Sequence, residues 1–154
     1  SEGAVIVRSG ADLVDRPGFY FGPSLLDHVT TDMACYRDEI FGPVLCVVRV
    51  ENFDDAVALV NANPYGNGVA IFTRDGNAAR LFSRAVSVGM IGINVPLPVP
   101  VASFSFGGWK NSLFGHAHMY GPEGMAFYTR GKVVTSRWPE PSESQIDLGF
   151  PRTR

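Results

Sequence analysis

The sequence lacks several features that would place it at once in a class of protein. No apolar run approaches the ~20 residues of a membrane-spanning helix, and the longest, 42–50, has the length of a strand. Residues 1–4 lack the basic start and apolar core of a signal peptide, and there is no initiating methionine, so we expect a piece of a longer polypeptide. Only 2 cysteines are present, too few for a disulfide framework, which favours a reducing, cytoplasmic setting.

The chain also lacks a large excess of positive or negative side chains. The 13 basic and 15 acidic side chains leave a formal net charge of −2, so nothing electrostatic suggests nucleic acid or an anionic membrane as a partner. Apolar residues make up 45% of the chain and charged residues 18%, which is typical of a globular protein rather than a disordered one. A length of 154 residues is enough for one domain with its own core.

No loop that would cradle a phosphate is visible. Gly66-Asn67-Gly68 precedes a strand instead of a helix, and Ile71 takes the place of the third glycine of a dinucleotide fingerprint, so we expect a turn there. His116 and His118 can share one side of a strand and bind a metal, but no cluster of cysteine, aspartate or glutamate completes a site. We therefore expect a solvated loop around these histidines and no metal site.

Neither cysteine has the sequence surroundings of a catalytic thiol, which needs partial exposure and a group that lowers its pKa. Cys46 lies in the middle of an apolar run and is expected to be a small core residue. Cys35 lies in a polar segment near Arg37, so a reactive role stays open, although the lack of a neighbouring base in the sequence favours an inert residue.

The middle of the chain alternates apolar strands with amphipathic helices. Helices are predicted over 52–61, with Asn52 as N-cap, and after Asp75, because apolar residues recur at helical spacing in both segments. Strands are predicted before, between and after these helices, at 44–50, 68–73 and 90–93. The resulting βαβαβ order indicates an α/β fold with a parallel sheet and right-handed crossovers.

The two ends of the chain carry weaker signals. Short strands are predicted at 5–7 and 19–21, and a short helix at 122–127 with proline in its first turn. Residues 128–138 alternate enough to predict a strand, and 139–154 form a polar tail rich in proline, serine and glutamate.

A carboxylate and an aromatic ring precede the predicted strand at 44–50. Glu39 and Phe41 lie two positions apart, and residues i and i+2 of an extended chain face the same side, so both can meet one ligand. A carboxylate in this place can accept hydrogen bonds from two adjacent ribose hydroxyls, and the ring can pack on a planar cofactor. The alternatives for Glu39 are a solvated loop position or an ion pair with Arg37.

The segment after the last predicted central strand is stiffened by Pro96, Pro98 and Pro100, which exclude a helix. Phe104 and Phe106 follow at the carboxyl end of a parallel strand, where open α/β sheets place their ligands. The alternative for both rings is ordinary core packing. Both interpretations stay open for Phe104, whereas a pocket-lining role is favoured for Phe106.

These segments together resemble the C-terminal part of an aldehyde dehydrogenase, from the start of the chain to about Trp138. The resemblance rests on Glu39-Ile40-Phe41-Gly42-Pro43-Val44, Asn63-Pro64-Tyr65-Gly66, Gly89-Met90-Ile91-Gly92-Ile93-Asn94, Phe106-Gly107-Gly108 and Tyr120-Gly121. Within that superfamily, residues 94–100 and 104–110 resemble the CoA-acylating methylmalonate-semialdehyde dehydrogenases. The resemblance implies part of the catalytic domain over 1–127, an oligomerisation strand over 128–138 and a polar tail over 139–154.

The resemblance also implies a reaction and its cofactors. Enzymes of this family use NAD and a cysteine nucleophile: the thiol adds to the aldehyde, hydride goes to the nicotinamide, and a thioester remains. In the CoA-acylating subfamily, CoA takes the acyl group and the substrate loses carbon dioxide. By the same resemblance, Glu39 holds the nicotinamide ribose, Phe41 is the ring beside it and Phe106 lines the aldehyde tunnel. The segment 128–138 would join sheets between the subunits of a homo-oligomer.

The chain departs from the family pattern where the chemistry begins. Neither Cys35 nor Cys46 follows the Gly-Gln-x sequence that precedes the family nucleophile, so no catalytic residue is assigned. The NAD domain, which lies upstream in the family, and the arginines that would hold the substrate carboxylate are also missing. We therefore expect this chain to be inactive alone and to hold no cofactor tightly. An assembly module and a weak binder of nucleoside-like ligands remain as alternatives, and the choice between malonate and methylmalonate semialdehyde stays open.

Overall fold

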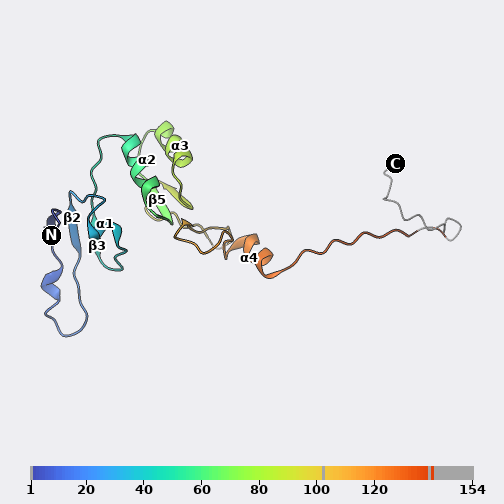
Figure 1. The fold of residues 1–154 in the computed structure, drawn as a ribbon, viewed down its shortest axis with the longest axis horizontal. Helices are drawn as coiled ribbons and strands as arrows, with labels where there is room; N and C mark the ends of the chain where they lie inside the picture. The colour runs from blue at the N-terminus through green and yellow to red at the C-terminus, as the bar shows by residue number, and fades with distance from the viewer. Residues whose placement is uncertain (1, 102, 139, 141–154) are drawn as a thin grey trace.

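The structure, a computed structural model, describes residues 2–101, 103–138 and 140. Figure 1 shows an elongated molecule in which an N-terminal sheet is followed by a central unit of helices and strands. A further helix comes next, and beyond it an extended arm of residues 129–138 leads away from the body. None of the helices among the described residues is long and apolar enough to cross a membrane.

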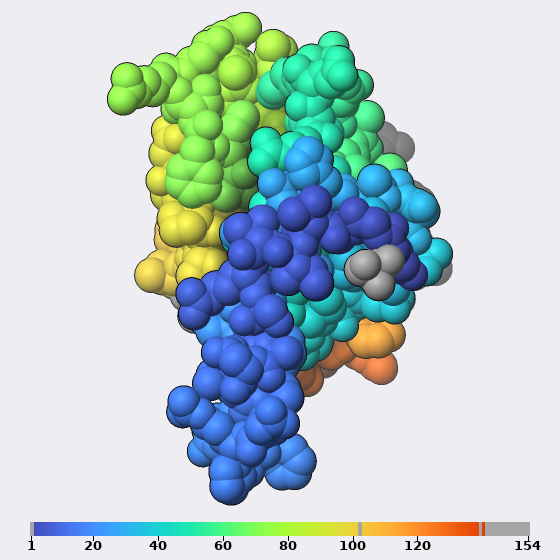
Figure 2. Space-filling view, turned by 90° about the vertical axis from the view of Figure 1, so that its left-hand side faces the viewer, coloured from blue at the N-terminus to red at the C-terminus, as the bar shows by residue number. Residues whose placement is uncertain are grey.

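The N-terminal sheet has the strand order β1-β2-β3. Strand β1 (Val5–Arg8) runs antiparallel to β2 (Ser24–Asp27), and β2 runs parallel to β3 (Val44–Cys46). The short 3-10 helix η1 (Ala11–Leu13) lies in the connection between β1 and β2. This connection stands out from the body in Figure 2, which looks onto the N-terminal part of the chain. Helix α1 (Ala34–Arg37) precedes β3.

The central unit is a parallel strand pair with two helices. Helix α2 (Phe53–Ala62) leads through β4 (Tyr65–Gly66) to β5 (Gly68–Ile71). Helix α3 (Gly76–Ala85) then crosses over to β6 (Met90–Ile93), which pairs with β5 in parallel register from Gly68 opposite Met90 to Ile71 opposite Ile93. The unit thus has the strand–helix–strand order that the sequence predicts for this stretch.

Both central helices begin at the predicted caps. Asn52 Oδ1 accepts a hydrogen bond from the backbone N–H of Asp55 at 2.9 Å, and Asp75 Oδ1 accepts one from the N–H of Asn77 at 2.7 Å. Each bond satisfies an N–H group that has no partner within its helix. The predicted starts of α2 and α3 are therefore confirmed.

A cluster of buried apolar side chains lies between α3 and the strands. Phe82, Val86 and Val88 are each 5% exposed. The rings of Phe53 and Phe82 meet edge to face with their centroids 6.3 Å apart. Six partly buried apolar residues pack around the buried three: Phe53, Val57, Val60, Val69, Ile71 and Ile91. Burying side chains of this size stabilises a fold by roughly 1.5–3 kcal/mol each, so this cluster fixes α2 and α3 against β5 and β6.

A short strand and a last helix follow. Strand β7 (Trp109–Lys110) pairs antiparallel with β4, so the segment after residue 103 returns to the central unit. Helix α4 (Gly121–Tyr128) has proline in its first turn, as the sequence predicts. Figure 1 shows α4 between the central unit and the arm.

The α/β class is confirmed, but the three predicted strands of the βαβαβ unit do not share one sheet. Strand β3 pairs with β2, whereas β5 pairs with β6 in a separate sheet. Strand β3 is shorter than predicted for 44–50: beyond Cys46 the only backbone bonds toward the β2 side run from Val47 N to the Leu26 carbonyl and from Val29 N to the Val47 carbonyl, among the described residues. It is also less buried than predicted, since Leu45, although paired with Leu25, is 63% exposed. The predicted strand at 19–21 is wrong: these residues lie in the projecting connection, and Phe19 is fully exposed.

The strand predicted over 128–138 is wrong at its first residue. Tyr128 is the last residue of α4, so a strand in this region begins no earlier than Thr129. Residues 129–138 pair with no other described segment of this chain, and the side chains of Val133, Val134 and Trp138 are 93%, 78% and 91% exposed. Their role in joining subunits stays a prediction. The predicted tail over 139–154 lies outside the described residues apart from Glu140.

Candidate functional site

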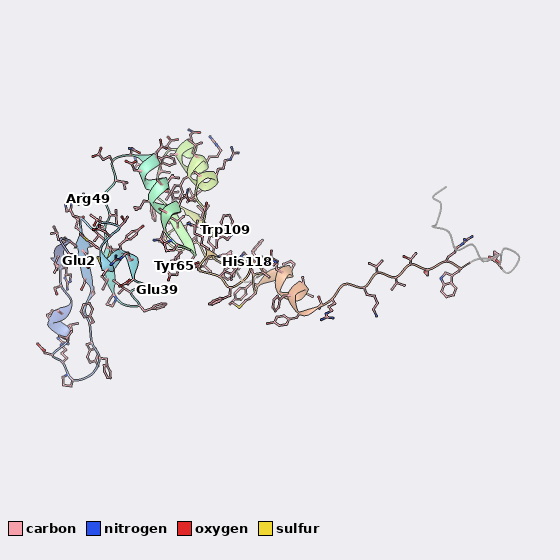
Figure 3. The ribbon with its side chains drawn as sticks, viewed as in Figure 1. Glu2, Glu39, Arg49, Tyr65, Trp109 and His118 are labelled. Atoms are coloured by element: carbon pink, nitrogen blue, oxygen red, sulfur yellow. The ribbon has the colours of Figure 1, made fainter. Side chains whose placement is uncertain are left out.

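The loop between α1 and β3 carries Glu39 and Phe41. Both residues are exposed, and 94% of Phe41 is open to solvent. Among the described residues no hydrogen bond or ion pair engages the Glu39 carboxylate, so the ion pair with Arg37 that the sequence left open is not formed. Figure 3 labels Glu39 on this loop, beside the N-terminal sheet. A free carboxylate and a free ring two positions apart are available to a ligand or to another chain.

The loop joins two held segments. It begins at the end of α1, where Asp38 N donates to the Ala34 carbonyl at 2.9 Å, and the first N–H of this helix, that of Ala34, donates to Glu2 Oε2 at 2.6 Å. At its other end, the carbonyl of Pro43 accepts a hydrogen bond from Ser24 N at 2.8 Å, which ties the loop to β2. The loop is thus held between α1 and the N-terminal sheet, while its middle, with Glu39 and Phe41, remains exposed.

An apolar groove of about 470 Å³ runs beside the end of the loop. Gly42 and Pro43 line it together with residues of β2 and β3, whereas Glu39 and Phe41 do not. A second cavity, of about 370 Å³, lies between α2 and β4–β5, with Tyr36 and Tyr65 in its wall. Neither cavity includes Phe106, so neither of them brings the predicted site residues together in the described part of the chain.

Phe106 is half-buried and stacks on Tyr120, with the two ring centroids 4.5 Å apart and an angle of 8° between their planes. Phe104, two positions earlier, is 63% exposed, so packing in the core of this chain does not explain that ring. The pocket-lining role of Phe106 stays a prediction. What the structure adds is a partner, Tyr120, that holds the Phe106 ring in one orientation.

Three polar side chains meet next to this ring pair. Glu123 Oε2 accepts hydrogen bonds from Ser105 Oγ at 2.6 Å and from the backbone N–H of His118 at 3.2 Å. His118 Nδ1 lies 3.2 Å from Ser105 Oγ and 3.4 Å from Glu123 Oε2. The hydrogen bond from Ser105, followed by that from the His118 backbone, lowers the pKa of Glu123 below its usual value. We call these three residues the Ser105–His118–Glu123 cluster.

The cluster corrects one expectation and adds residues that the sequence analysis missed. His118 does not lie in a solvated loop: only 18% of its side chain is exposed, because Ser105 and Glu123 hold it. The signal for Glu123 was its place three residues after Tyr120, the N-cap of α4, where a glutamate commonly reaches back to a free N–H group. Among the described residues, no group of three potential ligands could hold a metal ion.

The cluster contains a serine, a histidine and a carboxylate, but its geometry is not that of a hydrolase triad. In a triad, serine and carboxylate lie on opposite nitrogens of the imidazole. Here both lie at Nδ1, and the serine hydroxyl donates to the carboxylate. The arrangement ties segments together and does not activate the Ser105 oxygen.

Cys46 is partly buried and does not belong to the buried core that the sequence predicts for it, and the inertness of Cys35 stays a prediction. Cys46 Sγ donates a weak hydrogen bond to the carbonyl oxygen of Cys35 at 3.5 Å. Burial, and then the neighbouring Cys35, raise the pKa of the Cys46 thiol above its usual value. Since the thiolate is the nucleophile, this environment makes Cys46 less reactive than a free cysteine.

Comparison with known proteins shows that this chain is similar to malonate-semialdehyde dehydrogenases. A malonate-semialdehyde dehydrogenase of Pseudomonas aeruginosa is 59% identical over 156 aligned positions, which cover 94% of this chain and 31% of the relative. The malonate-semialdehyde dehydrogenase of Bacillus subtilis is 46% identical, over 91% of this chain and 29% of the relative. The chain therefore spans about 30% of the length of the relatives that it matches.

Solved structures agree with the sequence matches. The crystal structure of a methylmalonate-semialdehyde dehydrogenase from Oceanimonas doudoroffii superposes with a TM-score of 0.87 at 56% identity, over 92% of this chain and 30% of that one. A Sinorhizobium meliloti protein assigned as a methylmalonate-semialdehyde dehydrogenase, complexed with NAD, gives a TM-score of 0.86 at 50% identity, over 90% of this chain and 29% of that one. The sequence model of the Aldehyde dehydrogenase family matches residues 1–134. This chain, with the α/β fold of a part of that enzyme domain, belongs to the aldehyde dehydrogenase family.

Proposed function

We propose that this chain is the C-terminal portion of an NAD-dependent, CoA-acylating dehydrogenase of malonate or methylmalonate semialdehyde. The names of the relatives and the NAD in the Sinorhizobium meliloti complex support this proposal. The observation that carries it is the anchored loop that leaves the Glu39 carboxylate unpaired beside the exposed Phe41 ring. A carboxylate without a partner in a fixed loop is suited to accept hydrogen bonds from a diol.

In this proposal Glu39 and Phe41 form the wall of a nucleotide site. The two carboxylate oxygens of Glu39 can accept hydrogen bonds from the two hydroxyls of the nicotinamide ribose, and the Phe41 ring can cover the apolar side of the same ligand. NAD, when bound, supplies the hydride acceptor. Phe106 would line the path of the aldehyde, and CoA would be the acceptor of the acyl group.

The second part of the proposal is that the chain alone does no chemistry. The reaction needs a reactive thiol, and Cys46 is hydrogen-bonded to the Cys35 carbonyl with a raised pKa. Neither cysteine follows the family's Gly-Gln-x sequence. We expect no tightly bound cofactor, because Glu39 and Phe41 are two contacts without a phosphate anchor, and we propose a cytoplasmic location on the grounds of the free cysteines.

A chimera tests the proposal directly. The C-terminal segment of the Pseudomonas aeruginosa relative would be replaced by this chain, to which it is 59% identical. We expect CoA-dependent NADH formation from methylmalonate or malonate semialdehyde by the chimera, and none by this chain alone. An inactive chimera that is folded and binds NAD would contradict the proposed activity, and NADH formation by the isolated chain would contradict the proposed inactivity.

A second candidate function is assembly. The arm of residues 129–138 leaves its backbone and the side chains of Val133, Val134 and Trp138 exposed, and an unpaired extended segment can add to the sheet of another chain. We propose a homo-oligomer formed through this arm. Sedimentation of the chain at micromolar concentration would show an oligomer that the double substitution Val133→Asp and Val134→Asp disrupts. A monomer before substitution would contradict this second candidate.

A further inference from the structure

The segment that carries Phe106 contacts the start of α4 at several points. Residues on both sides of this ring are held by the stretch from His118 to Glu123 at the start of α4. On one side, Ser105 Oγ donates to Glu123 Oε2 at 2.6 Å. On the other side, Gly107 lies under the His118 imidazole, where a Cβ atom at Gly107 would come within 2.8 Å of His118 Cδ2.

The same stretch contacts the ring of Phe106 itself. Tyr120, between His118 and Glu123, stacks on it at 4.5 Å with nearly parallel planes. Gly121 has a positive φ of 67° and packs its backbone against the Phe106 segment, since a Cβ atom there would lie 2.8 Å from Ser105 N and 3.1 Å from the carbonyl carbon of Phe104. The Phe106 side chain, its neighbours Ser105 and Gly107, and the backbone just before Phe106 are therefore all in contact with one short stretch.

Glu123 is the residue that links these contacts. One carboxylate oxygen receives the Ser105 hydroxyl and the His118 N–H, so it joins the Phe106 segment to the turn before α4. Because the Ser105 proton goes to Glu123, the short contact between Ser105 Oγ and His118 Nδ1 requires a proton on Nδ1. Glu123 thereby orients the Ser105 side chain, which precedes Phe106 in the chain, and the His118 ring, which lies over Gly107.

We propose that Glu123 is a positioning residue for Phe106, acting through Ser105 and His118, and that it sets how well the site distinguishes malonate from methylmalonate semialdehyde. The inference rests on the proposed function, in which Phe106 lines the path of the aldehyde. The two substrates differ by one methyl group on the carbon next to the aldehyde. A packed apolar wall discriminates one such group by roughly 10–200-fold, and only if the wall stands in a fixed place.

The positioning role can be measured without any activity. The chain labelled with 3-fluorotyrosine would show a ¹⁹F resonance for Tyr120, assigned by its loss in Tyr120→Phe, and Phe106→Leu would report the position of this resonance without the stacked ring. We expect Glu123→Ala and Ser105→Ala each to move the Tyr120 resonance toward its position in Phe106→Leu. In Glu123→Gln the resonance should stay near its original position, because the amide oxygen still accepts from Ser105. Glu51→Ala, at an exposed glutamate outside the cluster, is the matched control.

Two variants separate the loss of the Ser105–Glu123 hydrogen bond from a weakened start of α4. Ser105→Ala leaves the hydrogen bond between Glu123 and the His118 backbone in place, so it probes the link without weakening the start of α4. The double variant Ser105→Ala with Glu123→Ala should move the resonance no further than the larger single effect, because both remove the same link. A Tyr120 resonance that stays at its original position in both single variants would overturn the positioning role.

The selectivity is measured in the chimera with the Pseudomonas aeruginosa relative. We expect Glu123→Ala to change the ratio of kcat/KM for the two semialdehydes by roughly tenfold, within the range that one methyl group allows, while the KM for NAD stays unchanged. A moved resonance with an unchanged ratio would overturn the selectivity claim. A chimera that oxidises neither semialdehyde would instead count against the proposed function, whereas the resonance of Tyr120 tests the positioning role in either case.

Discussion

The ammonium group of Lys110 lies 2.9 Å from the carbonyl oxygen of Asn63, just beyond the end of α2. It also donates to the carbonyl of Asn61 at 3.0 Å, so one cation caps the C-terminal end of the helix. Lys110 belongs to β7, which pairs with β4. This contact connects the segment that carries Phe106 to the central unit around Phe82.

We predict that Lys110→Met lowers the free energy of unfolding by about 1 kcal/mol, because a cation at a helix C-terminus is worth about this much and the carbonyl groups lose a donor. Chemical denaturation followed by far-UV circular dichroism measures the change. Lys132→Met, on the exposed arm, is the control and should leave the midpoint unchanged. Equal midpoints for both variants would contradict the role of Lys110.

The cluster around Phe82 should dominate the stability of the central unit. We predict that Phe82→Ala costs about 3–5 kcal/mol, because it removes a ring that is 5% exposed and leaves a cavity between α3 and Phe53. Phe114→Ala, at a fully exposed ring, should change stability by less than about 0.5 kcal/mol. Denaturant midpoints measure both changes. A loss of comparable size in both variants would contradict the placement of Phe82 in the core.

The pairing of Asp27 with Arg49 gives a pH prediction. Arg49 donates to both carboxylate oxygens of Asp27, at 3.0 and 2.7 Å, and this bond lowers the pKa of Asp27 from 3.8 to about 2. Because the folded pKa lies below the unfolded one, the stabilisation is fully present above pH 3.8 and is lost as the pH falls toward 2. We expect the Asp27 carboxyl carbon, followed by NMR, to titrate at a higher pH in Arg49→Gln, with its pKa still below the ordinary value because the His28 backbone N–H keeps donating to Asp27 Oδ1. Titration at an unchanged low pH in that variant would rule out Arg49 as the cause.

The Cys46 thiol should react slowly with a disulfide reagent at neutral pH, and its rate should rise only at high pH. Burial raises its pKa, so the thiolate forms only above the ordinary value of 9.0. We predict that in Cys35→Ser, where Cys46 is the remaining thiol, the rate with a disulfide reagent keeps rising beyond that pH. The variant Cys46→Ser provides the comparison. A fast reaction of Cys46 at neutral pH would be incompatible with an inert residue.

Local signals in the sequence predicted the local structure of the central unit. Asn52 and Asp75 stand where a helix N-terminus needs an acceptor, and both caps are formed. The proline at position 122 predicted the start of α4 to within a residue. Such signals act between residues that are close in the chain, which is why they can be recognised in one sequence.

Pairings between distant segments were not predictable in the same way. Strand β2, with the short sequence Ser24-Leu25-Leu26-Asp27, has no alternation of apolar and polar residues, so the partner of β3 was missed and one sheet was expected where the chain forms separate ones. The contact of Ser105 with Glu123 spans 18 positions and depends on the backbone approach at Gly121. Glu39 and Phe41 could be singled out because their relation is one of adjacent spacing.

The most direct test of the account is the KM for NAD of the chimera with Glu39→Ala. Loss of hydrogen bonds from ribose hydroxyls to a carboxylate costs about 1.5–3 kcal/mol, which predicts a rise in the KM for NAD of roughly 10-fold or more. Asp38→Ala, at the neighbouring exposed carboxylate, is the matched control and should leave the KM unchanged. A KM for NAD that is the same in Glu39→Ala, Asp38→Ala and the unsubstituted chimera would contradict the assignment of Glu39 to the cofactor.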